Sequence, residues 1–123
     1  MEYQIMEKNG EKLILLEGAG TPIGREEDAN TLIEICARNG TYLLLVEGKR
    51  LSEDFLRLRT GVAGAVLQKF AIYGVKVAAV LDKDRAKGKF KEFLAESNRG
   101  SMFRVYEDHA EAEHWLLEGP ASS

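Results

Sequence analysis

The amino-acid sequence predicts a single α/β domain with a mixed, mostly parallel five-stranded sheet, an N-terminal β-hairpin and four helices. Asn9-Gly10 separates two strand-like segments and predicts a hairpin, because both residues tolerate positive φ. After the hairpin, short apolar runs alternate with helical patterns, which is typical of parallel strands joined by crossover helices. We expect the domain to span residues 1–118 and residues 119–123 to form a flexible C-terminal tail.

Each expected strand is a short run rich in apolar side chains. The runs at residues 41–47 and 75–81 have apolar centres, interrupted in the second only by Lys76, which is typical of strands buried on both faces of a parallel sheet. The first strand is expected to run antiparallel to the second because a tight turn joins them. In chain order the expected strands are residues 3–7, 12–17, 41–47, 75–81 and 102–106.

The expected helices are identified from apolar positions spaced three or four residues apart and from residues that begin or end helices. The first begins with Glu26, Glu27 and Asp28, whose negative charges favour the positive N-terminal end of a helix. Thr60 is expected to cap the second helix and Asp108 the fourth. The four helices are expected at residues 25–38, at residues 60–73, at residues 89–98 and after Asp108.

Gly64 lies inside the second expected helix. Glycine within a helix costs about 1 kcal/mol relative to alanine, so its presence there requires a reason. We therefore expect another backbone to pack closely against it.

Composition and charge limit the classes of function. A net charge of −3 gives no reason to expect nucleic acid or an acidic membrane as a partner. The longest apolar runs have the length of strands and are too short to span a membrane. Residues 1–4 do not begin a signal peptide pattern, and the single cysteine, Cys36, fits a reducing compartment, so a cytoplasmic location is predicted. Cys36 is expected to be a buried apolar residue.

Several stretches resemble a bacterial family of domains of unknown function, number 4180 in that series. The resemblance is carried by Asp54-Phe55, by Leu58-Arg59-Thr60-Gly61-Val62-Ala63-Gly64, by Leu67-Gln68-Lys69-Phe70 and by Glu96-Ser97-Asn98-Arg99-Gly100. It spans most of the chain. As the name of the family states no function, the resemblance implies no activity.

The size and the order of elements are also similar to those of STAS domains, the fold of anti-sigma factor antagonists. In these domains an Asp-Ser-Ser-Gly turn opens a helix after a central strand, and its last serine is phosphorylated. Leu58-Arg59-Thr60-Gly61 lies at the matching place, with leucine and arginine in place of the aspartate and the first serine. The resemblance implies a STAS-like fold in which Thr60 stands where the phosphorylated hydroxyl stands.

The turn at Thr60 and Gly61 is the first candidate site. A helix N-terminus offers free N–H groups and a positive dipole end, so it suits an anion or a phosphorylated hydroxyl. Basic residues close in the chain add positive charge, and they are Lys49, Arg50, Arg57 and Arg59. The alternative is a plain helix cap with solvated basic neighbours.

Acidic residues at two strand ends form the second candidate site. Glu47 ends one apolar strand, and Asp82 and Asp84 follow another, which resembles the toprim pattern of primases and topoisomerases. That resemblance implies carboxylates that hold Mg²⁺ for phosphoryl chemistry. Toprim domains place a further strand and helix between the glutamate and the aspartates, and this chain has one helix there. The alternative is that the carboxylates only form polar strand ends.

Aromatic residues and the strand ends offer two further kinds of site. Trp115, Tyr106 and Tyr73 could anchor a protein partner or a homodimer, or complete the core. A small anionic ligand could bind at the strand ends, in a pocket lined by Lys49, Arg59 and Asp82.

The leading hypothesis from the sequence is a non-enzymatic regulatory or protein-binding module that acts near Thr60. The alternatives are a Mg²⁺-dependent phosphoryl-transfer or nuclease-type enzyme that uses Glu47, Asp82 and Asp84, and a domain that binds a small anionic ligand. No cofactor or metal is expected except Mg²⁺ in the enzyme alternative.

Overall fold

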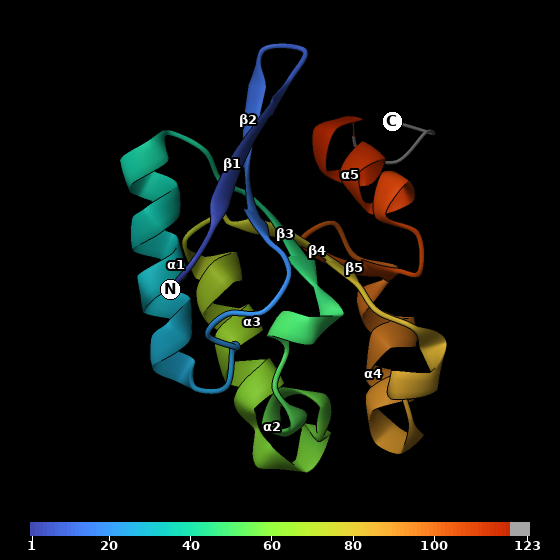
Figure 1. Cartoon of the computed structure of the whole chain (residues 1–123). Coiled ribbons are helices and arrows are strands. Elements are labelled where there is room, and N and C mark those ends of the chain that lie inside the picture. The colour runs from blue at the N-terminus through green and yellow to red at the C-terminus, as the bar shows by residue number, and fades with distance from the viewer. Residues whose placement is uncertain (119–123) are drawn as a thin grey trace.

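The five strands form one sheet whose spatial order is their order in the chain, β1-β2-β3-β4-β5 (Figure 1). β1 pairs with β2 in the antiparallel direction through the turn at Asn9 and Gly10, and all other neighbours are parallel. This confirms the predicted fold class. In this computed structural model, which describes residues 1–118, the strands are β1 (Gln4–Lys8), β2 (Glu11–Leu16), β3 (Leu43–Glu47), β4 (Lys76–Val80) and β5 (Phe103–Tyr106).

The helices occur where the sequence predicts them, with one addition. α2 is a single turn that the sequence does not predict, and short 3-10 turns flank it and precede α4. The predicted tail, residues 119–123, lies outside the described residues. The helices are α1 (Glu26–Asn39), α2 (Glu53–Leu56), α3 (Val62–Ile72), α4 (Gly88–Ser97) and α5 (His109–Glu118), and the 3-10 turns are η1 (Gly48–Arg50), η2 (Leu58–Thr60) and η3 (Lys83–Arg85).

The sheet is covered on both faces, which explains why its central strands are apolar throughout. The crossover helices α1, α3 and α4 pack on one face, because right-handed crossovers between sequential parallel strands leave their helices on the same side. Figure 1 shows α1 and α3 side by side there. α5 follows the last strand and packs on the other face. A hydrophobic core therefore lies on each face of the sheet. In β3, Leu44 and Val46 point into the core beneath α1, α3 and α4, and Leu45 points into the core beneath α5.

The side chain of Arg50 is buried beside the carboxyl end of β3, with 1% of its surface exposed. Its Nε donates to the Thr21 carbonyl at 3.0 Å, Nη1 to Glu17 at 3.3 Å and Nη2 to Glu2 at 2.8 Å. A Cβ at Gly20 would lie 2.8 Å from its guanidinium carbon. Arg50 therefore fastens the β2–α1 loop and the N-terminal segment to η1. Arg50 was expected to add positive charge to an anion site at Thr60, and this is wrong, because its side chain is buried and bonded to three backbone carbonyls elsewhere.

Gly64 is exposed on α3, and a Cβ added there would meet no atom within 4 Å. The expectation that another backbone packs against it is therefore wrong. The close approach occurs instead at Gly48, where a Cβ would lie 2.9 Å from the carbonyl oxygen of Val80.

Within residues 1–118 no helix is both long enough and apolar enough to cross a membrane.

We expect Arg50→Met to lower the free energy of unfolding by about 3–5 kcal/mol, because it leaves three inward carbonyl oxygens without their donors. Urea unfolding followed by circular dichroism measures the change. Lys49→Met is the matched control, because Lys49 is the exposed neighbour of Arg50. This substitution should change the free energy of unfolding by no more than about 0.5 kcal/mol. Equal effects of the two substitutions would contradict the structural role of Arg50.

We expect Gly64→Ala to stabilise the protein by about 1 kcal/mol, because alanine has the higher helix propensity and has space at this position. Gly48→Ala should destabilise it, because the new Cβ would meet the Val80 carbonyl. The same unfolding measurement compares the two. Destabilisation by Gly64→Ala would show that the glycine is needed for close packing after all.

Candidate functional site

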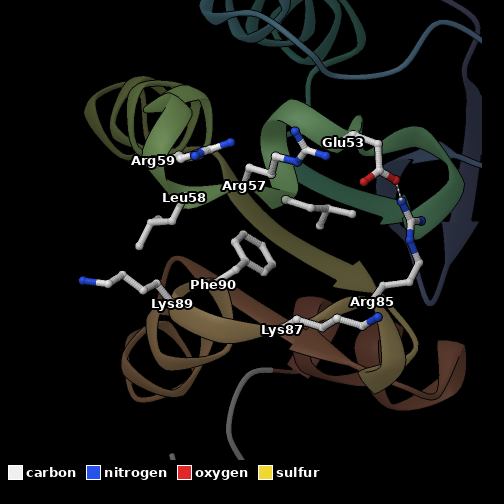
Figure 2. Close-up of a pocket in the computed structure, with 9 residues that line it drawn as sticks. Glu53, Arg57, Leu58, Arg59, Arg85, Lys87, Lys89 and Phe90 are labelled. Carbon is white, nitrogen blue, oxygen red and sulfur yellow. Dashed lines mark ion pairs between the residues drawn. The ribbon is translucent and has the colours of Figure 1, made fainter.

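A cleft of about 450 Å³ opens between the segment that follows β3 and the first turn of α4 (Figure 2). We call it the basic cleft, and it is lined by Glu53, Leu56, Arg57, Leu58, Arg59, Arg85, Lys87, Lys89 and Phe90. Its two walls follow the carboxyl ends of the neighbouring parallel strands β3 and β4. Ligands of α/β proteins commonly bind beyond the carboxyl ends of such strands.

The lining of the cleft is strongly positive, although the chain as a whole carries a net charge of −3. Five of its nine residues are cationic and one, Glu53, is acidic. Glu53 Oε1 lies 3.6 Å from Arg85 Nη2, and in this ion pair Glu53 is exposed and Arg85 half-buried (Figure 2). The other four cations form no ion pair with any residue of the described chain. The cleft therefore presents positive charge that the protein itself does not neutralise.

The N-terminus of α4 contributes to this positive charge. Lys87 holds the N-cap position without a side-chain capping hydrogen bond, and the first turn of the helix carries no acidic residue. Lys87 precedes the helix and Lys89 lies in its first turn, where a cation opposes the helix dipole. α1 shows the usual arrangement, because the Asp28 carboxylate accepts the N–H groups of Gly24 at 2.9 Å and Arg25 at 3.0 Å. The N-terminus of α4 thus has the features that suit an anion.

Two contacts fix the walls of the cleft relative to each other. Arg85 Nη1 donates to the Gly48 carbonyl at 2.7 Å, which joins the loops after β3 and β4. Beneath the cleft, the rings of Phe55 and Phe90 meet edge to face with their centroids 6.2 Å apart. The cations are therefore presented on a packed scaffold.

The predicted basic residues separate into two groups. Arg57 and Arg59 line the basic cleft, as the expected anion site near the turn requires. Lys49 is exposed in η1 and is not among the lining residues. Asp82 is also not among them, so the expected pocket of Lys49, Arg59 and Asp82 is not the one that forms here.

Thr60 does not cap α3. Gly61 holds that position, with a φ of 78°, and the helix begins at Val62. The hydroxyl oxygen of Thr60 accepts the Val62 N–H at 3.2 Å. The hydroxyl also lies 2.5 Å from the Asp54 carbonyl and 2.9 Å from the Arg57 carbonyl, one of which accepts its proton. The predicted cap is wrong by one residue, and the hydroxyl is bound to the backbone of its own turn. Phosphorylation of Thr60 stays a prediction.

The acidic strand ends lie on the same edge of the sheet. Glu47 ends β3, and its Oε1 accepts the N–H of Gly18 at 3.0 Å, so it holds the start of the β2–α1 loop. Asp82 and Asp84 follow β4 and are exposed. No three His, Cys, Asp or Glu side chains within residues 1–118 are grouped so that they could hold a metal ion. The geometry gives the toprim-like alternative no support.

The remaining candidate side chains are mainly structural. Trp115 is 2% exposed and belongs to the core beneath α5, so it cannot anchor a partner. Tyr106 packs beside it, whereas Tyr73 is 58% exposed. Cys36 is buried as expected, and burial raises the pKa of its thiol to about 11. The thiol is therefore protonated at neutral pH, which argues against a nucleophilic role.

The sequence interpretation missed the α4 side of the cleft. The sequence does indicate this side of the cleft, because every second residue is cationic in the segment that immediately follows a buried strand. The cations of that segment are Lys83, Arg85, Lys87, Lys89 and Lys91.

A comparison with known protein families assigns the chain to a family, but the description of that family states no activity. The family model described as Domain of unknown function (DUF4180) matches residues 8–116. The chain belongs to this family. The DUF4180 match includes every residue of the basic cleft and confirms the resemblance seen in the sequence. No curated protein and no solved structure matches the chain. The resemblance to STAS domains stays a prediction.

Proposed function

We propose that this DUF4180 protein is a non-enzymatic module that binds a small anionic ligand in the basic cleft. The observation that carries the proposal is the group formed by Arg57, Arg59, Lys87 and Lys89. These four cations line one cleft without an ion pair inside the described residues, in a chain of negative net charge. A bound anion would neutralise charge that otherwise repels itself.

The side chains of the cleft favour binding over catalysis. Proton transfer and covalent catalysis require a positioned acid, base or nucleophile. The described lining residues include no histidine, cysteine, serine or threonine, and their one carboxylate, Glu53, is paired with Arg85. Lys87 and Lys89 are exposed and lack the desolvated surroundings that activate a catalytic lysine. The cations can hold and orient an anion, which is the role we assign to them.

This proposal differs from a module whose partner recognises Thr60 itself. The Thr60 hydroxyl is bound to backbone atoms, whereas its neighbour Arg59 lines the cleft. The single cysteine, Cys36, is a buried free thiol, and we place the function in the cytoplasm on that ground.

We expect calorimetric titration with inorganic phosphate at low ionic strength to detect binding, because screening is weak when the Debye length is about 30 Å. Lys89→Gln should weaken binding about tenfold, the value of one charge-assisted hydrogen bond. Added sodium chloride should weaken it further in the wild type.

Lys91→Gln is the matched control, because Lys91 is an exposed cation of the same helix that does not line the cleft. The affinity of this variant for inorganic phosphate should stay within about twofold of the wild-type value, since exposed charges outside a site contribute little. A wild type that binds no phosphate, or an equal loss in Lys91→Gln, would refute the proposed function.

A further inference from the structure

We infer that the ligand of the basic cleft is a phosphate monoester that carries an apolar group. The inference rests on the proposed anion-binding function and names the ligand class. We place the phosphate beside Arg57 and Arg59, with Lys89 on the facing wall, and the apolar group over Leu58 towards Phe90 (Figure 2).

The apolar part follows from the floor of the cleft. Three of its nine lining residues are Leu56, Leu58 and Phe90, and Figure 2 shows the Phe90 ring between the cations of the two ends. Leu56 and Phe90 are buried, whereas Leu58 is half-exposed in the cleft. A purely polar anion such as sulfate would leave the exposed part of Leu58 in water. A ligand with an apolar group gains affinity by covering it.

The phosphate follows from the number and kind of the cations. A carboxylate carries one negative charge and would leave most of the cations in the cleft without a counter-charge. A phosphate monoester carries nearly two charges at neutral pH and three strongly accepting oxygens. The planar guanidinium groups of Arg57 and Arg59 provide the donor forks that bind phosphate oxygens in pairs, and the ammonium groups add point charges.

The position of Glu53 indicates a single anionic group. Glu53 and Arg85 form the end of the cleft opposite to Arg59 and Lys89 (Figure 2). The Glu53 carboxylate would repel a second anionic group there, while the other end carries cations alone. The ligand is thus charged at one end and apolar at the other.

The test is calorimetric titration of the full chain with phenyl phosphate, inorganic phosphate and benzoate. Phenyl phosphate should bind about tenfold more tightly than inorganic phosphate, because about 60 Å² of apolar surface leaves water. It should also bind at least about tenfold more tightly than benzoate, which lacks the second charge.

Leu58→Asn should bring the affinity for phenyl phosphate down to the affinity that the same variant has for inorganic phosphate. Ile72→Asn is the matched control, since Ile72 is an apolar residue that is 69% exposed on α3 and does not line the cleft. Ile72→Asn should still bind phenyl phosphate about tenfold more tightly than inorganic phosphate. If Leu58→Asn fails to fold, Leu58→Ala replaces it, and the wild-type ratios decide the ligand class by themselves.

The outcomes separate this inference from the function on which it rests. Equal affinities for phenyl phosphate and inorganic phosphate, or for phenyl phosphate and benzoate, overturn the ligand class and leave anion binding intact. A tenfold ratio that survives Leu58→Asn places the apolar group elsewhere and overturns the inference. Binding of none of the three anions refutes the proposed function itself.

Discussion

The carboxyl edge of the sheet is held together by arginine side chains that donate to backbone carbonyl groups. Buried Arg50 joins the loop after β2 and the N-terminal segment to η1, and Arg85 joins η1 to the loop after β4. A guanidinium suits this task because its five donors have fixed directions and its charge is permanent. The walls of the basic cleft are the segments after β3 and β4, so the shape of the cleft depends on these bonds.

One wall of the cleft is the start of α4, where the residues do not favour local helix stability. α1 begins with acidic residues and a bonded carboxylate, whereas α4 begins uncapped with lysines at its positive end. Phe90 and Leu94 compensate by burying the inner face of α4 in the core. Departures of this kind are expected at functional sites, because the sequence there meets a demand other than folding. An anion would satisfy both the cations and the free N–H groups of the helix.

The fold could be predicted from the sequence more fully than the site. Apolar runs and helical spacing are local, and they were sufficient to predict the sequence of elements, the mostly parallel sheet and the hairpin. The start of α3 was misplaced because Gly61 and Thr60 are equally good helix-opening residues. Thr60 belongs to the preceding 3-10 turn, where its hydroxyl bonds to local backbone atoms, and this leaves Gly61 at the cap. Arg57 and Arg59 could be assigned to the site because they adjoin this turn. Lys89 could not, because it lines the same cleft only through the pairing of β3 with β4.

Amide chemical shifts during a titration with phenyl phosphate test the central claim most directly, because they locate the ligand on the chain. The account predicts saturable shifts that are largest at Arg59, Lys89 and Phe90, on the two walls of the basic cleft. Backbone amides of the β2–α1 loop around Gly20, which Arg50 holds in place, should change little. Shifts centred on that loop, or shifts spread over the surface without saturation, would contradict it.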